Sequence, residues 1–105
     1  MTDKQIIFST VGSKTEAQTI AQSLVERQLA ACVNIVGPIE SVYRWKGEVE
    51  SSAEFMLLIK TTAEHFESVQ EAILELHSYE LPECIAMNIE TGSSEYLDWI
   101  ENSVQ

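Results

Sequence analysis

The chain has 105 residues, and its 17 acidic and 6 basic side chains give a formal net charge of −11 at pH 7. A surface this acidic repels phosphate groups, so we expect no nucleic-acid partner and no attraction to anionic membranes, while cations are favoured. The length and the 45% content of hydrophobic residues predict a single globular domain that spans residues 1–105.

The cellular compartment is expected to be the cytoplasm. The N-terminal residues have no long apolar run typical of a signal peptide, and no stretch approaches the ~20 apolar residues needed to cross a membrane. The two cysteines, Cys32 and Cys84, form no C-x-x-C pair and lie in apolar runs, as inert thiols of a reducing compartment do.

The first elements are a strand and a helix. QIIFSTV (5–11) is rich in strand-forming residues, and Gly12 ends it. SKTE (13–16) has the S-x-x-E form of a capping box and predicts the start of a helix. Apolar residues then follow at three- and four-residue spacing, which predicts a buried helical stripe: Ala17, Ile20, Ala21, Leu24 and Val25.

A long hairpin is predicted next. ACVNIVG (31–37) reads as a strand, and Gly37–Pro38 interrupts it as a bulge or bend would. Apolar and charged residues then alternate up to Lys46–Gly47, the expected hairpin turn. EFMLLIKT (54–61) returns as an apolar strand.

The remaining elements are a helix, a strand and a last helix. TTAE (61–64) is a second capping-box pattern, and the helix after it must end before Pro82. CIAMNIE (84–90) predicts a fourth strand. SSEYLDWIENSV (93–104) predicts an amphipathic helix with three inward residues: Tyr96, Leu97 and Ile100.

The element order βαββαβ plus a terminal helix predicts an α+β fold, a ferredoxin-like sandwich with an extra C-terminal helix. Several strands carry apolar residues on both faces, so the sheet face without helices needs a cover, and a partner subunit would supply it. Tyr43 and Trp45, near the hairpin tip, would be costly to leave in water. We therefore predict that the hairpin reaches a neighbouring subunit.

The chain resembles the CutA family of divalent-cation tolerance proteins over most of its length, in CVNIVGPIESVYRWKGEVE (32–50), EFMLLIKTT (54–62), HSYELPECIAM (77–87) and YLDWI (96–100). The resemblance implies a ferredoxin-like fold, a homotrimer similar to the PII-type signalling proteins, hairpins exchanged between neighbours, and binding of divalent ions, copper above all. It implies no established enzymatic activity.

Two positions depart from the family pattern. Family members usually carry His-Pro-Tyr-Glu where this chain has Ser78 in place of the proline, so the exit from the helix into the loop is expected to be looser. Some relatives carry a cysteine near the end of the first strand, at the position of Ser9. A soft thiolate ligand is therefore missing there, which weakens a preference for Cu(I).

The candidate metal ligands are His77, Glu80 and Glu83, which are residue types that bind Cu(II) or Zn. His77 and Glu80 are three residues apart and would share a helix face if the helix extended that far. Their spacing is no recognised metal signature. The alternative is that His77 caps the helix C-terminus or lies in an interface.

The expected function is non-enzymatic divalent metal tolerance by a homotrimer that binds cations such as Cu(II). The alternative is a PII-like signalling or scaffold module that binds a small ligand or protein in clefts between subunits. The cleft or interface residues would then be Tyr43, Trp45, Lys60, His77, Tyr79, Glu80 and Trp99. Catalysis is not expected, because His77 and the two cysteines form no recognised nucleophile–base set.

Overall fold

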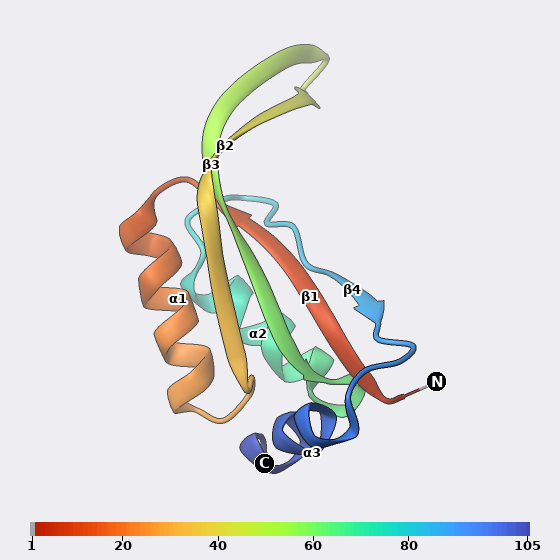
Figure 1. Ribbon diagram of the computed structural model, residues 1–105. Helices are drawn as coiled ribbons and strands as arrows, with labels where there is room; N and C mark the ends of the chain where they lie inside the picture. Colours follow the sequence, from red (N-terminus) through yellow and green to blue (C-terminus); the bar gives the residue numbers. More distant parts are fainter. Residues whose placement is uncertain (1) are drawn as a thin grey trace.

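The computed structural model describes residues 2–105, in which four antiparallel strands form one sheet in the order β2-β3-β1-β4 (Figure 1). The order of elements along the chain is that of a ferredoxin-like α+β sandwich with one added helix, so the predicted fold class is confirmed. The elements are β1 (Lys4–Val11), α1 (Lys14–Glu26), β2 (Cys32–Trp45), β3 (Glu48–Thr62), a 3₁₀ turn (Ala63–His65), α2 (Phe66–Leu76), β4 (Ile85–Asn88) and α3 (Ser94–Ser103).

The core lies between one face of the sheet and the helices α1 and α2. Alternate residues of β1 and β3 point toward these helices because side chains alternate between the two faces of a strand. Full burial of each large aliphatic side chain contributes about 1.5–3 kcal/mol, so this layer is the main source of stability. Its fully buried residues include Ile7, Val11, Ile20, Leu24, Leu57, Ile59, Val69 and Ile73.

The two predicted capping boxes have different outcomes. The Ser13 hydroxyl accepts a hydrogen bond from the Glu16 amide at 3.1 Å, so the first helix is capped as predicted. The Glu16 carboxylate does not return this contact, because it accepts hydrogen bonds from Ser78. The second capping box is wrong: Thr61 is a buried β3 residue whose hydroxyl donates to the Leu29 carbonyl at 2.7 Å.

The hairpin of β2 and β3 has the predicted bend and turn. The register of the two strands shifts across Gly37–Pro38, which confirms a bulge there. Lys46 and Gly47 have φ angles of 50° and 83°, as a two-residue hairpin turn requires. Beyond the bulge the hairpin projects away from the helices (Figure 1), and Val42 and Val49 on it are 67% and 66% exposed.

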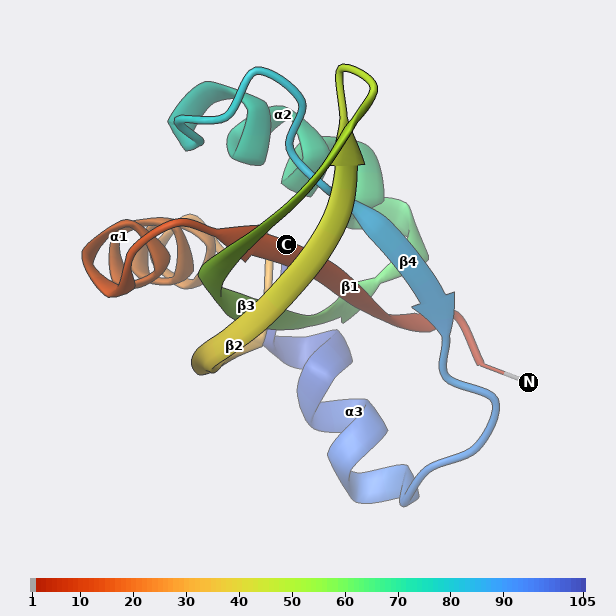
Figure 2. The same ribbon diagram turned by 90° about the horizontal axis from the view of Figure 1, so that it is seen from above.

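The sheet face opposite α1 and α2 is largely uncovered, and we call it the open face. α3 lies at one end of it (Figure 2), where Lys60 of β3 lies beneath the Tyr96 ring. Elsewhere this face carries the polar residues Thr10 and Asn34 and a larger number of apolar ones: Ile6, Phe8, Val36, Met56, Leu58, Ile85 and Met87. Met87 is 62% exposed and Ile85 is 57% exposed, so nothing within residues 2–105 covers this edge.

The C-terminal elements are shorter and more exposed than the sequence predicts. β4 begins at Ile85, so Cys84 lies before the strand and not within it. In α3, Ile100 is buried and Leu97 is half-buried, but Tyr96 is 43% exposed, so its predicted inward position is wrong. None of the helices in residues 2–105 has the length and the apolar composition required to cross a membrane.

Candidate functional site

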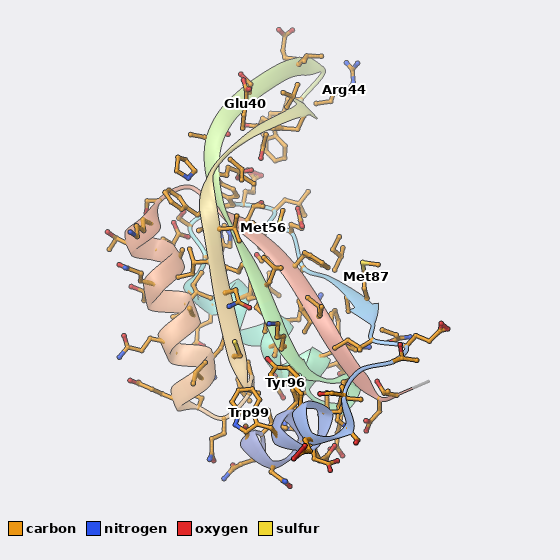
Figure 3. All side chains as sticks on the ribbon, in the orientation of Figure 1. Glu40, Arg44, Met56, Met87, Tyr96 and Trp99 are labelled. Carbon is orange, nitrogen blue, oxygen red and sulfur yellow. The ribbon has the colours of Figure 1, made fainter. Side chains whose placement is uncertain are left out.

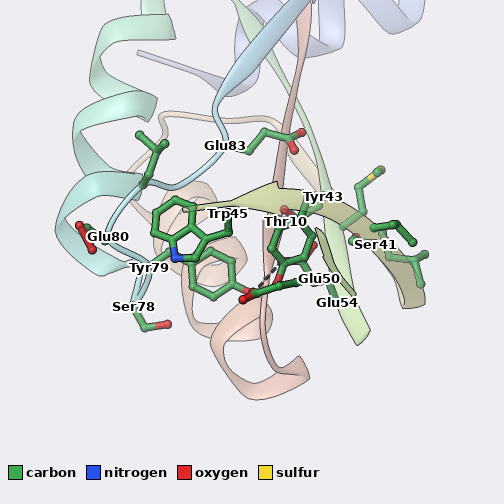
Figure 4. Close-up of a pocket in the computed structure, with 14 residues that line it drawn as sticks. Thr10, Ser41, Tyr43, Trp45, Glu50, Glu54, Ser78, Tyr79, Glu80 and Glu83 are labelled. Carbon is green, nitrogen blue, oxygen red and sulfur yellow. Dashed lines mark hydrogen bonds between the residues drawn. The ribbon is translucent and has the colours of Figure 1, made fainter. Parts of the chain in front are cut away.

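A groove of about 740 Å³ lies between the hairpin and the loop that follows α2 (Figure 4). We call it the hairpin groove. Its walls come from β2, from β3 and from loop residues 78–83, with Thr10 of β1 at the base. Three aromatic side chains and four carboxylates line it: Tyr43, Trp45, Tyr79, Glu50, Glu54, Glu80 and Glu83.

The loop begins where α2 ends, at Leu76. His77 has extended backbone angles, φ −82° and ψ 142°, and its amide donates the last hydrogen bond to the Ile73 carbonyl at 2.8 Å. The helix therefore ends several residues before Pro82, which does not itself terminate it. It follows that His77 and Glu80 do not share a helix face.

The His77 ring is buried and holds the loop in place. Its Nε2 lies 2.7 Å from the Thr10 carbonyl oxygen, and its Nδ1 lies 3.1 Å from the Tyr79 amide nitrogen. A carbonyl oxygen only accepts and an amide only donates, so Nε2 carries the proton and Nδ1 accepts. Both ring nitrogens are thus engaged within the chain, one with β1 and one with the loop itself.

A carboxylate of α1 clamps the start of the loop. The two Glu16 oxygens accept from the Ser78 amide at 2.8 Å and from the Ser78 hydroxyl at 2.9 Å. Glu16 Oε2 also lies 3.4 Å from His77 Nδ1. A proline at position 78 would offer neither donor, so Ser78 fastens this loop to α1, and the expectation of a looser helix exit is wrong.

A buried carboxylate and a tyrosine form the centre of the groove. The Tyr79 hydroxyl donates to Glu54 Oε2 at 2.7 Å (Figure 4), and Glu54 is only 6% exposed. Burial, followed by the hydrogen bond to Glu54, holds the pKa of Tyr79 well above its usual range. The Tyr79 ring packs against His77 with centroids 4.7 Å apart, and a side-chain β carbon at Gly12 would lie only 3.2 Å from the Tyr79 hydroxyl oxygen.

The carboxylates of the groove repel one another. Burial raises the pKa of Glu83, and the nearby charge of Glu54 raises it further. Glu54 was not among the residues that the sequence singled out. Its signal is an acidic side chain directly before the apolar run of β3, where a charge is unexpected.

The predicted metal ligands are only partly brought together. Glu80 and Glu83 line the hairpin groove, whereas the His77 ring is not part of its lining and has both nitrogens hydrogen-bonded. Within the described part of the chain, no three His, Cys, Asp or Glu side chains lie close enough to hold a metal ion. One copy of residues 2–105 therefore does not assemble the predicted three-ligand set.

The predicted cleft residues divide between two places. Tyr43, Trp45 and Tyr79 line the hairpin groove. Lys60 and Trp99 instead lie at the α3 end, where both contact Tyr96. The Lys60 Nζ atom is 5.8 Å from the centroid of the Tyr96 ring, and the centroids of the Tyr96 and Trp99 rings are 5.3 Å apart. Figure 3 shows Tyr96 and Trp99 on α3. Lys60 follows Glu54 by about 20 Å along β3, because a strand rises about 3.3 Å per residue.

Two further positions singled out in the sequence lie outside the groove lining. Ser9 points toward α1 and α2 and is fully buried, so its side chain is in the core. Cys84 is partly buried against the core, and burial, with a smaller effect of Glu83, raises the pKa of its thiol. Neither residue lines the groove.

The sheet order, the two helices on one face and the long projecting hairpin define the class of ferredoxin-like α+β sandwich proteins. The family model described as "CutA1 divalent ion tolerance protein" matches residues 5–103. This chain belongs to the CutA1 family.

Relatives of known structure support the same assignment. The divalent-cation tolerance protein CutA of Thermus thermophilus is 46% identical over 100 residues, which cover 95% of this chain and 97% of the relative. The solved structure of that Thermus protein has a TM-score of 0.95 at 45% identity, covering 97% of this chain and 99% of the other. The periplasmic divalent cation tolerance protein CutA of Archaeoglobus fulgidus has a TM-score of 0.94 at 42% identity, with 97% and 99% coverage.

Proposed function

We propose that this protein is a homotrimer that acts in divalent-cation tolerance, binds divalent cations such as Cu(II), and has no enzymatic activity. Membership of the CutA1 family supports the role in divalent-cation tolerance, because relatives of this chain are named for it. The net charge of −11 and the four carboxylates of the hairpin groove also favour cations over anions.

The observation that carries the trimer is the open face with its projecting hairpin. Ile85, Met87 and Val36 of the open face are 57%, 62% and 48% exposed, and the hairpin adds Val42 and Val49. A contiguous apolar surface of this kind marks an interface. A PII-like arrangement of three copies would bury the open faces together and seat each hairpin on a neighbour.

The cation site is proposed to be shared between copies. One chain offers Glu80 and Glu83 at the groove, and it brings no third ligand to them within residues 2–105. A neighbouring subunit would complete the coordination. In this arrangement His77 acts by holding the loop that carries the two glutamates.

Metal titration tests the proposal. Metal-free protein is titrated calorimetrically with Cu(II), Zn and Mg, and its mass in solution is measured by light scattering. A Glu80→Gln/Glu83→Gln double variant is expected to lose most of the heat, whereas Glu67→Gln/Glu71→Gln, on exposed positions of α2, keeps it. Equal heats for the two variants would remove Glu80 and Glu83 from any site, and a monomer at micromolar concentration would remove the trimer.

The hairpin groove favours a second candidate, a PII-like signalling or scaffold module. Its volume of about 740 Å³ suits a small organic molecule better than a bare ion. Thermal-shift screening of metal-stripped protein with metabolites tests this function. A shift that requires no metal supports it, and no shift with any compound of the panel counts against it.

The absence of catalysis and a cytoplasmic location belong to the same proposal. The raised pKa of Cys84 disfavours the thiolate that a nucleophile needs. Cys32 and Cys84 are both free thiols, as in a reducing compartment. Since the Archaeoglobus relative is described as periplasmic, fractionation of cells followed by immunodetection is the direct test of location.

A further inference from the structure

We propose that the hairpin groove binds an organic cation, with an ammonium group held between the Glu54 carboxylate and the surrounding aromatic rings. This inference deepens the second candidate function, a module that binds a small ligand, and it does not depend on metal binding.

The size of the groove decides between an ion and a molecule. Its volume of about 740 Å³ falls within the roughly 300–1,000 Å³ typical of small-molecule sites. A metal ion needs several ligand atoms within about 2.0–2.6 Å of one point. The described chain gathers no such set, and the nearest imidazole, His77, is already hydrogen-bonded through both nitrogens.

Glu54 is a buried acidic residue without a cationic partner within residues 2–105. The residue is only 6% exposed, and its carboxylate accepts a hydrogen bond from the neutral hydroxyl of Tyr79. None of the ion pairs within residues 2–105 involves Glu54. Buried carboxylates are normally paired with a cation, so this one points to a cationic ligand.

The other charges around Glu54 have the same sign. Glu50, Glu80 and Glu83 line the same groove, and as far as the described residues go its lining includes no Lys, Arg or His. Carboxylates of like charge that line one groove repel one another. A bound monocation would relieve this repulsion.

The aromatic side chains supply the rest of the recognition. Tyr43, Trp45 and Tyr79 all face the groove (Figure 4), and an aromatic face attracts a cation within about 6 Å of the ring centroid. Lys46 Nζ lies 5.6 Å from the Trp45 centroid, so this indole already accepts a cation from the chain itself. Lys46 sits in the exposed hairpin turn and is not part of the lining.

The cage is held in place before any ligand arrives. The Tyr79 ring is fixed by its hydroxyl bond to Glu54 and by packing on His77, and the Glu16–Ser78 clamp fixes the loop that carries it. A preorganised site loses less conformational entropy on binding, which favours recognition of a small cation.

A pair of isosteric probes tests the proposal. Choline and its uncharged isostere 3,3-dimethyl-1-butanol have the same shape, so only the charge differs. Binding to the full-length protein is followed through Trp45 fluorescence in a Trp99→Phe variant, with a chelator present to remove metals. We expect saturable binding of choline and at least about tenfold weaker binding of the isostere, the size of a cation–π and charge contribution.

Matched variants locate the site. Glu54→Gln keeps an oxygen for the Tyr79 hydroxyl and is expected to weaken choline binding about tenfold or more. Glu40→Gln makes the same charge change elsewhere on the hairpin and is expected to have no effect. Should Glu54→Gln not fold, Trp45→Leu, followed by calorimetry, removes an aromatic wall and is expected to weaken choline in the same way.

Several outcomes overturn the proposal. Equal affinity for choline and the isostere, no saturable response of folded wild-type protein, or equal weakening by Glu54→Gln and Glu40→Gln each contradict it. The chelator separates this result from the metal titration. Metal binding without choline binding would overturn the organic-cation site alone, and choline binding without metal binding would leave it standing.

Discussion

The hydrogen bond between Tyr79 and Glu54 is the most informative single contact to remove. Tyr79→Phe keeps the ring, its packing on His77 and its position in the groove, and it deletes only the hydroxyl. The deleted group donates to Glu54 Oε2 at 2.7 Å, and Glu54 is 6% exposed. The variant therefore leaves a buried carboxylate without its donor.

The expected cost follows from that geometry. Hydrogen bonds to charged groups contribute about 1.5–3 kcal/mol, and the open groove beside Glu54 admits water as a substitute donor, so we expect the lower end, about 1.5 kcal/mol. For a domain near 100 residues, 1 kcal/mol corresponds to roughly 4 °C or more in Tm, which gives a decrease of about 6 °C.

The assay is denaturant and thermal unfolding at fixed protein concentration, with Tyr96→Phe as the matched control. Tyr96 is 43% exposed on α3, and a phenylalanine there retains the stacking on Trp99. We expect the control to change the free energy of unfolding by less than about 0.5 kcal/mol.

The difference in the free energy of unfolding between wild type and Tyr79→Phe is also expected to depend on pH. The raised pKa of Tyr79 means that the folded state keeps the proton after the unfolded chain has lost it. The stabilisation is therefore complete below the ordinary tyrosine pKa of 10.0 and is lost as the pH rises beyond it. Two results would refute this reasoning. One is an equal loss of unfolding free energy in Tyr79→Phe and Tyr96→Phe. The other is a stability difference between wild type and Tyr79→Phe that does not narrow at alkaline pH.

Three further predictions concern the groove, its clamp and the core. Because burial and Glu54 raise the pKa of Glu83, Glu83→Gln is expected to raise the free energy of unfolding at pH 7. This gain in stability should vanish below pH 4.5, the ordinary pKa of a glutamate, because both states are then protonated. A Glu83→Gln variant that is less stable than wild type at pH 7 would contradict the prediction. Glu16→Ala removes both acceptors of the clamp and should lower the free energy of unfolding by about 1–2 kcal/mol. Ser78→Ala keeps the amide donor and should lower it by only about 0.5–1 kcal/mol. Equal losses for the two variants in chemical unfolding would show that the amide contact contributes nothing. Ser9 is fully buried, and its hydroxyl has no hydrogen-bond partner within the described residues, so Ser9→Ala should stabilise by about 1 kcal/mol in the same assay. A loss of stability would show that the hydroxyl is satisfied.

Local patterns in the sequence were sufficient for the architecture. Short apolar runs rich in strand-forming residues predicted the first and third strands, and the stripe that begins at Ala17 predicted α1 with its Ser13 cap. Gly37–Pro38 and Lys46–Gly47 predicted the bulge and the turn of the hairpin. These features depend on neighbouring residues along the chain, so a single sequence contains the information they need.

The second capping box shows where local reasoning fails. TTAE has the right residues at the right spacing, but Thr61 belongs to the inward face of β3. Its hydroxyl donates to the carbonyl oxygen of Leu29, which lies in the loop after α1. The same applies to Glu16, whose carboxylate serves the distant loop at Ser78 instead of its own helix. A strand register and a loop contact override a local preference when they bury the group.

The site itself was decided by the tertiary structure. The histidine of HSYELPEC matches a metal ligand in type, yet its ring donates to Thr10, a residue 67 positions earlier in the chain. Tyr79 meets Glu54 across 25 residues, and Lys60 and Trp99 separate from the groove because the strand carries them to its other end. Sequence determines which chemical groups are present and how each local segment folds. Only packing between distant segments determines which of those groups face one another, because hydrogen bonds and burial depend on spatial and not sequential distance.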